Sequence, residues 1–168
     1  MATILSFIAP HGFQDIEYAD SKAELEAAGH SVITVSTTFE CLGKYGTVCA
    51  ADHLLDEIHF DEYDALLLVG GPGIYDYFHS PKLIALAQQF HSAQKPVSAI
   101  CAAVAILAQA NLLSGKKSTC FEGVADQLLA KGAHYTGSLV EVDDRVVTAS
   151  GPEAARDFGK AIAQLFTQ

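Results

Sequence analysis

Short apolar runs alternate along the chain with segments in which apolar residues recur at helical spacing. The runs at 4–9 and 65–69 carry no charge and are typical of strands covered on both faces. Between the first run and an alternating strand at 31–36, the spacing predicts a helix over 16–27. A strand, a helix and a second strand within 36 residues predict a parallel sheet. The apolar positions of this helix, which we expect to face the sheet, are Ile16, Ala19, Ala23 and Ala27.

The rest of the chain continues this alternation. Two glycines between β-prone pieces predict a small hairpin at 39–50, and Ser80 followed by Pro81 predicts the start of a helix that runs to about residue 93. We therefore predict one domain of the α/β class over residues 1–168, a flavodoxin-like three-layer sandwich with a mostly parallel sheet and helices on both faces. Further strands are expected at 97–100, 117–121, 139–142 and 145–148, and further helices at 102–110, at 124–131 and after 152.

Composition and charge narrow the class of protein. Half of the residues are hydrophobic and 18% are charged, which excludes intrinsic disorder. The formal net charge of −10 argues against nucleic acid and against an anionic membrane surface as partners, since both are bound through basic patches. No apolar run approaches the roughly 20 residues of a membrane span, and no basic leader precedes the first strand. We expect a cytoplasmic protein with reduced thiols and without a metal or cofactor.

Cys101 stands where the strand at 97–100 changes into a helix of small and apolar residues. The side chain of a nucleophile at such a sharp turn is pushed out of the backbone, and small neighbours such as Ala99 and Ala102 relieve the crowding. A helix N-terminus also favours the thiolate through its dipole and its unpaired N–H groups. Two interpretations are open: Cys101 is a reactive nucleophile, or it is one more small buried hydrophobe, as most free cysteines are.

Three segments follow predicted strands at the carboxyl edge of the sheet, where ligand sites form in open parallel sheets: 11–17, the glycine-rich loop 70–73 and Cys101. An amide of the glycine-rich loop could stabilise an oxyanion, although a plain turn explains the same glycines. The spacing of this loop matches no nucleotide-binding motif. We expect Glu17 to be buried and protonated beside the cysteine, and Asp15 to be solvated and to complement the helix dipole.

Four motifs carry a family resemblance: Gly-Phe-Gln-Asp-Ile-Glu at 12–17, Gly-Gly at 70–71, Ala-Ile-Cys-Ala-Ala at 99–103 and Thr-Ala-Ser-Gly-Pro at 148–152, supported by His-Tyr-Thr at 134–136. In this order they resemble the ThiJ/PfpI superfamily, and its parkinsonism-associated, deglycase-like branch in particular, over essentially the whole chain. The resemblance implies a flavodoxin-like fold and a homodimer. It also implies an oxidation-prone nucleophile at Cys101, a buried glutamate at Glu17, and oxyanion amides at Gly71 and Ala102.

The resemblance implies activities of several kinds, among them a cofactor-free glyoxalase, a protein deglycase, proteolysis, chaperone action and redox sensing. The first hypothesis is an enzyme acting on small reactive carbonyls, with Cys101 as nucleophile and Glu17 as proton shuttle. The rival is a non-catalytic stress protein or chaperone that senses peroxide through oxidation of Cys101 to the sulfinate. A third hypothesis is hydration of an isocyanide or similar electrophile, for which a carboxylate at Asp15 or Glu17 would matter.

The sequence departs from the superfamily pattern at several positions. The protease-like branch has a histidine directly after the cysteine and a glutamate near the glycine-rich loop; this chain has Ala102 and lacks that glutamate, which argues against a Cys-His protease. Deglycase-like relatives often carry a histidine at the position of Phe121, and a proline at that of Val104. Losing the histidine removes a polar group that could position a hydrated aldehyde. We expect His11 to be exposed, and three thiols to be ordinary and buried or half-buried: Cys41, Cys49 and Cys120.

Overall fold

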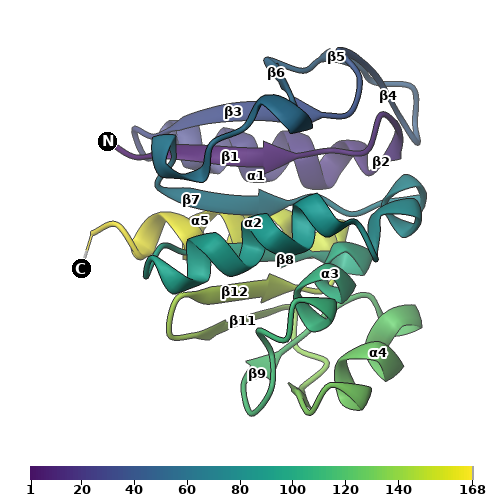
Figure 1. Ribbon diagram of the computed structural model, residues 1–168, viewed down its shortest axis with the longest axis vertical. Coiled ribbons are helices and arrows are strands. Elements are labelled where there is room, and N and C mark those ends of the chain that lie inside the picture. The colour runs from purple at the N-terminus through teal and green to yellow at the C-terminus, as the bar shows by residue number, and fades with distance from the viewer. Residues whose placement is uncertain (168) are drawn as a thin grey trace.

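Seven strands form one central sheet in the computed structural model, which describes residues 1–167 (Figure 1). These strands are β1 (Thr3–Phe7), β3 (Ser31–Ser36), β6 (His53–Leu54), β7 (Ala65–Leu68), β8 (Val97–Ile100), β11 (Val140–Asp143) and β12 (Val146–Ala149). Their order across the sheet is β11-β12-β8-β7-β1-β3-β6. Every neighbouring pair is parallel except β11 and β12, so the predicted mostly parallel sheet is confirmed.

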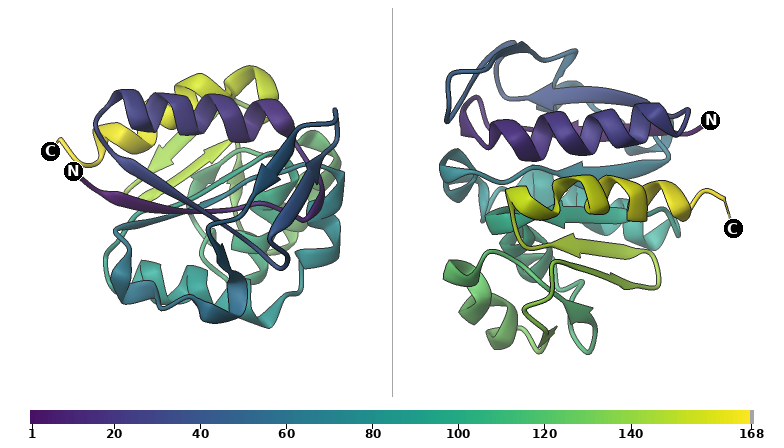
Figure 2. Two further views of the ribbon diagram at one scale, coloured as in Figure 1. Left: turned by 90° about the horizontal axis from the view of Figure 1, so that it is seen from above. Right: turned by 180° about the vertical axis from the view of Figure 1, so that it is seen from behind.

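Helices cover both faces of this sheet. α1 (Asp15–Ala27) and α5 (Ala155–Gln164) lie together on one face, and α2 (Pro81–Ser92) and α3 (Val104–Gln109) lie on the other, as Figure 2 shows. α4 (Ala125–Ala130) lies beyond α3, towards the β11 edge of the sheet (Figure 1). The three layers confirm the predicted flavodoxin-like sandwich.

The apolar run of β7 supplies both halves of the core. Successive strand residues point to opposite faces. Leu66 and Leu68 therefore join the core beneath α2 and α3, whereas Leu67 joins the core beneath α1 and α5. All three side chains are fully buried. This double burial explains why the run is continuously apolar instead of alternating with polar residues.

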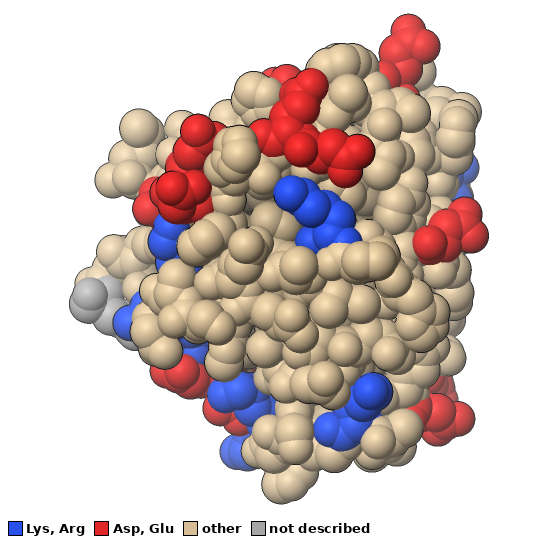
Figure 3. Space-filling model, in the orientation of Figure 1, with Lys and Arg blue, Asp and Glu red and all other residues tan. Residues whose placement is uncertain are grey.

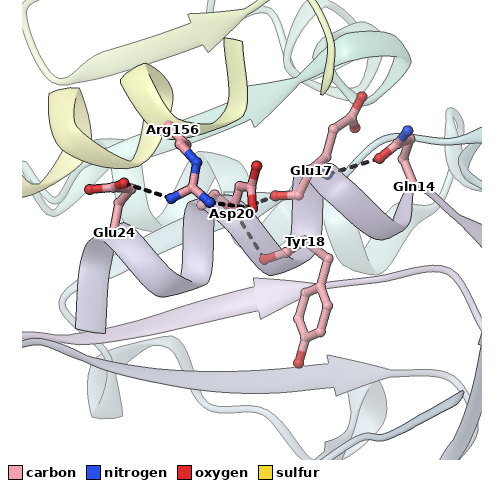
Figure 4. Close-up of polar contacts among 7 residues, drawn as sticks. Gln14, Glu17, Tyr18, Asp20, Glu24 and Arg156 are labelled. Carbon is pink, nitrogen blue, oxygen red and sulfur yellow. Dashed lines mark hydrogen bonds and ion pairs between the residues drawn. The ribbon is translucent and has the colours of Figure 1, made fainter. Parts of the chain in front are cut away.

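The inward face of α1 differs from the predicted one. Ile16 is 46% exposed, and the three alanines expected beside it are exposed too, whereas Glu17, Tyr18 and Leu25 are buried. The side chain of Gln14 caps the helix by accepting a hydrogen bond from the Glu17 backbone N–H at 2.8 Å. Figure 4 shows Glu17 and Tyr18 leaving the helix in opposite directions. The apolar spacing of the alanines therefore gave the wrong face.

Contact with α5 fixes how α1 is turned. A Cβ atom at Gly159 of α5 would lie 2.9 Å from the Ser21 carbonyl oxygen, so the two helices approach too closely for any larger residue. Arg156 of α5 reaches Asp20 and Glu24 of α1 at 3.3 and 3.1 Å (Figure 4). Exposed ion pairs stabilise by at most about 1 kcal/mol, so the close approach at the glycine is the stronger constraint. A small and polar side of α1 accordingly meets α5.

The predicted hairpin belongs to a second, three-stranded sheet. It consists of β2 (His11–Phe13), β4 (Glu40–Gly43) and β5 (Val48–Ala50), in that order. β4 and β5 are antiparallel, as expected for a hairpin, and Gly46 in their connection has φ of +94°. The short strand β2, which directly follows the turn after β1, was not predicted. It ties the hairpin to the carboxyl end of β1.

Two predicted elements are shorter than expected. The strand expected at 117–121 is reduced to β9 (Lys117–Ser118), which pairs with β10 (His134–Tyr135). The helix expected at 102–110 begins as a 3₁₀ turn over residues 101–103, and α3 has only six residues. The helix dipole at Cys101 is therefore weaker than a long helix would supply.

Within residues 1–167, no helix is long and apolar enough to cross a membrane. On the face drawn in Figure 3, lysine and arginine side chains are scattered among uncharged residues. They do not gather there into one basic patch.

Candidate active site

Cys101 occupies a strained position at the end of a central strand. It directly follows β8 and has φ of 60°, in the left-handed region that costs an L-residue about 1–2 kcal/mol. β8 pairs with β7 on one side and with β12 on the other, and this sheet holds the residue in place. The sharp turn predicted at this cysteine is present.

Three residues meet where β7 and β8 end. The Gly70 backbone N–H donates a hydrogen bond of 2.9 Å to Oε1 of Glu17. A Cβ atom at Gly70 would lie 2.6 Å from that oxygen and 2.8 Å from Cβ of Cys101. Only glycine fits there, because a side chain would collide with both neighbours. The same observation shows that the carboxyl and the cysteine both lie next to this glycine.

Burial dominates the ionisation of Glu17. Its side chain is fully buried, and this burial raises its pKa from 4.5 to about 7. Hydrogen bonding with Cys101 and with the Gly70 amide lowers the pKa in part, as does the charge of Lys44, whereas the charge of Glu153 raises it. Within residues 1–167, Oε2 of Glu17 has no hydrogen-bond partner of ordinary geometry. This oxygen is therefore free to take a proton from a neighbouring group.

Cys101 is held as a thiol, which corrects the predicted thiolate. Burial raises its pKa, and the nearby Glu17 carboxylate raises it further. A hydrogen bond from the Ala102 backbone N–H lowers the pKa but does not outweigh these effects. The carboxyl and the thiol titrate as a pair, and the first proton lost near pH 7 is that of Glu17. At neutral pH the Glu17 carboxyl is thus about half ionised, and it lies beside a protonated thiol.

An open cavity of about 300 Å³ lies over this pair. All four residues expected at the site, Cys101, Glu17, Gly71 and Ala102, line it. The Gly71 backbone N–H donates no hydrogen bond within the described residues, so it is available to a ligand. The remaining lining residues are Gln14, Lys44, Tyr45, Pro72, Tyr75, Phe121 and Pro152. Apart from the carboxyl, the lysine and the glutamine amide, the lining is apolar and aromatic.

Asp15 has a different role from the one predicted. It is buried, and its two carboxylate oxygens accept hydrogen bonds from the backbone N–H groups of Tyr45 and Thr47 at 2.8 and 2.9 Å. Burial alone would raise the pKa of Asp15, but hydrogen bonding with the Thr47 side chain, together with these backbone N–H groups, outweighs burial and lowers it. The carboxylate clamps the β4–β5 turn, and this turn places Lys44 and Tyr45 in the cavity wall.

Several lining residues could not be found by sequence reasoning. Lys44 and Tyr45 are distant in sequence from every other site residue, and the Asp15 clamp and the pairing of β4 with β2 bring them there. Tyr75 had a usable signal, because it is the second residue after the glycine-rich loop that was expected at the site. The pKa of Tyr75 is raised by burial and then by Cys101.

Other expectations about single residues can be checked directly. Phe121 lines the cavity and is 44% exposed, and His11 is exposed. The remaining thiols are buried or half-buried as predicted: Cys41, Cys49 and Cys120. In the described chain, no group of three or more His, Cys, Asp or Glu side chains is placed to hold a metal ion.

Comparison with known proteins places the chain in a family. An uncharacterized protein of Methanocaldococcus jannaschii is 38% identical over 162 residues, which cover 94% of this chain and 79% of that protein. The deglycase PfpI of Pyrococcus furiosus is 32% identical over 149 residues, covering 87% and 89%. The crystal structure of a ThiJ/PfpI domain protein from Brachyspira murdochii superposes with a TM-score of 0.95 at 31% identity and covers 98% of this chain and 96% of that one. The model of the DJ-1/PfpI family matches residues 2–165, and the chain therefore belongs to the DJ-1/PfpI family.

Proposed function

We propose that the protein is a cysteine-dependent, cofactor-free enzyme that acts on small reactive carbonyls, as a glyoxalase or deglycase does. The observation that carries this proposal is the position of a buried carboxyl, Glu17, next to the Cys101 thiol beneath a cavity open to small molecules. The name deglycase of the Pyrococcus furiosus relative supports the same chemistry.

In the proposed reaction, the Glu17 carboxylate takes the thiol proton while the Cys101 sulfur forms a bond to the aldehyde carbon. The aldehyde oxygen becomes an alkoxide that accepts hydrogen bonds from the Gly71 and Ala102 amides. Return of the proton from Glu17 to this oxygen completes a thiohemiacetal. With a 2-oxoaldehyde, Glu17 then moves the C1 proton to C2 while the C1 hydroxyl proton passes to the C2 oxygen, which leaves a thioester carbonyl at C1 and a hydroxyl group at C2. Water hydrolyses the thioester to a 2-hydroxy acid and restores the thiol.

The protonated thiol favours this reaction over direct oxidation. Peroxide attacks thiolates, and the raised pKa of Cys101 keeps the thiolate population small. Carbonyl addition does not need a preformed thiolate, because Glu17 accepts the proton during the step. A protonated thiol next to a buried base therefore supports base-assisted addition better than peroxide sensing.

The rival function is a redox-responsive stress protein or chaperone in which peroxide converts Cys101 to the sulfinate. One observation favours it: the Ala102 N–H is aimed at the sulfur, where it would also bind a sulfinate oxygen. A Cys-His protease has no such support. Within the described residues, no histidine lines the cavity, so no imidazole base is available to the thiol.

Turnover of glyoxal and methylglyoxal by the wild type and by Cys101→Ser tests the proposal. We expect the wild type to form glycolate and lactate, and the serine variant to match the buffer background. Cys120→Ala is the matched control, because Cys120 is a buried thiol outside the cavity lining, and it should keep full turnover.

The two functions give different results in this experiment. If the wild type forms no hydroxy acid, or forms it equally well without Cys101, the enzyme proposal is wrong. Wild type that lacks turnover but gains two oxygens on Cys101 after mild peroxide supports the redox function instead. The mass of the intact protein and of its cysteine peptides distinguishes these outcomes.

A further inference from the structure

Cys41 and Cys49 are direct cross-strand neighbours in the β4–β5 hairpin. Their Cα atoms are paired in the antiparallel register, between the pairs Glu40–Ala50 and Leu42–Val48. Residues directly opposite each other on two strands point to the same side. Cys41 is 2% exposed and Cys49 is half-buried against the same core, so both thiols are on the inner side of the hairpin.

The register places this pair within the range of a disulfide. Gly43 donates its backbone N–H to the Thr47 carbonyl oxygen at 2.8 Å, and hydrogen-bonded and non-hydrogen-bonded pairs alternate along a hairpin. The cysteine pair, two positions further along, is therefore a hydrogen-bonded pair with a Cα separation of about 5.5 Å. Disulfides have Cα separations of about 4.4–6.8 Å. Cβ atoms at such a pair are about 5.5 Å apart, so bond formation requires them to approach by about 1 to 2 Å.

The two thiols have unequal access. Burial raises the pKa of Cys41, and the neighbouring Cys49 raises it further, which places the two groups within electrostatic reach. The Cys49 thiol lies 3.5 Å from the Tyr18 hydroxyl and is the more exposed of the pair. An oxidant from solvent therefore meets Cys49 first.

We propose that Cys41 and Cys49 form a redox site separate from Cys101, which closes reversibly to a cross-strand disulfide. With hydrogen peroxide, Cys49 is oxidised to the sulfenic acid and one water is released. The Cys41 thiol then attacks the Cys49 sulfur, the S–S bond forms, and a second water leaves. Two thiols lose two electrons and two protons, and one peroxide is reduced to two waters. Diamide, a diazene, accepts the same two electrons and two protons and becomes a hydrazine.

This disulfide should be readily reduced. The approach of the two Cβ atoms strains the hairpin, and strained disulfides are the labile ones. The site is independent of the proposed carbonyl chemistry, because neither cysteine lines the cavity. Whether or not this disulfide forms therefore says nothing about turnover at Cys101.

The sequence makes a direct test possible in the wild-type protein. Tryptic cleavage at Lys22, Lys44 and Lys82 separates the two cysteines into peptides 23–44 and 45–82. Cys101 and Cys120 fall in peptides 83–116 and 118–131, so each cysteine has its own peptide. The folded protein is treated with diamide, its free thiols are then blocked with N-ethylmaleimide in denaturant so that buried thiols react, and the chain is digested without reductant. We expect 23–44 linked to 45–82. Dithiothreitol before digestion should separate them.

The controls keep the test decisive. In Cys49→Ser, the linked species should vanish and Cys41 should carry the maleimide. Cys120, which has no cysteine opposite it, should remain maleimide-labelled in the oxidised wild type. The proposal is overturned if both hairpin cysteines stay labelled after diamide, or if Cys49 links to a second copy of 45–82 while Cys41 stays free.

Discussion

Glutamine in place of Glu17 should remove a pH-dependent loss of stability. Glu17→Gln keeps the shape of the side chain and an acceptor for the Gly70 amide, but it cannot ionise. The wild-type carboxyl has a pKa raised by burial to about 7. Between its ordinary value of 4.5 and this value, the folded protein holds a proton that the unfolded chain has released. The wild type therefore loses stability as the pH rises through this window, and the variant does not.

The size of the effect follows from the two pKa values. A change from 4.5 to about 7 corresponds to about 3 kcal/mol in the free energy of unfolding. The free energy of unfolding of Glu17→Gln, relative to wild type, should thus rise by about 3 kcal/mol between about pH 4 and about pH 8. Most of this change should occur between 4.5 and 7, the two ends of the window.

Urea unfolding followed by circular dichroism measures this difference, with reductant present so that no cysteine oxidises. Glu26→Gln is the matched control, because Glu26 lies on the same helix and its side chain is 51% exposed. Its stability relative to wild type should change by less than about 0.5 kcal/mol over the same range. If the Glu17→Gln difference stays constant between the two pH values, Glu17 is not a buried acid with a raised pKa, and the reasoning fails.

Three further substitutions test the surroundings of the site. Gly70→Ala should lower the free energy of unfolding in urea by about 2 kcal/mol and slow alkylation of Cys101, because the added methyl group meets both Glu17 and the cysteine. An unchanged stability and an unchanged alkylation rate would contradict that contact. Asp15→Asn should weaken the hairpin clamp by about 2 kcal/mol at neutral pH, and this difference should shrink as the pH falls from the ordinary value of 3.8 through the lowered wild-type pKa. A pH-independent difference would count against a charged clamp. Lys44→Met should raise the pH midpoint of turnover by a few tenths of a unit, because the lysine charge lowers the pKa of Glu17, whereas Lys22→Met should leave the midpoint unchanged.

The fold was readable from the sequence because its main strands are buried on both faces. The uncharged runs at 4–9 and 65–69 are typical of strands covered on both faces, and most of each run lies in a strand of the central sheet, β1 and β7. The order of those strands also placed the glycine-rich loop and Cys101 at one edge, where the cavity lies.

The rotation of α1 was not readable from the sequence. Alanines recur at helical spacing but gain little by burial, so they indicate a helix and not its inward side. The side of α1 that meets α5 is decided by the close approach at Gly159 and Ser21, a tertiary contact. Glu17 was correctly expected at the site, because its segment follows a strand at the same edge of the sheet as the other motifs. Ile16 beside it points outwards.

The electrostatics of the site were only half predictable. A carboxyl one turn inside a helix near a buried edge was expected to have a raised pKa, and it does. The protonation of Cys101 depends on how deeply the thiol is buried and how near the carboxylate lies, and neither appears in the sequence. The same holds for Asp15, whose partners are 30 and 32 residues away.

The pH dependence of methylglyoxal turnover by the wild type tests the central claim most directly. If Glu17 is the base that takes the proton of Cys101, kcat/KM should fall about tenfold per pH unit below an apparent pKa of about 7, the value for Glu17 in the free protein. An activity that instead rises only through the ordinary thiol pKa of about 8.5 would contradict the account, because a free thiolate would then be the reacting species.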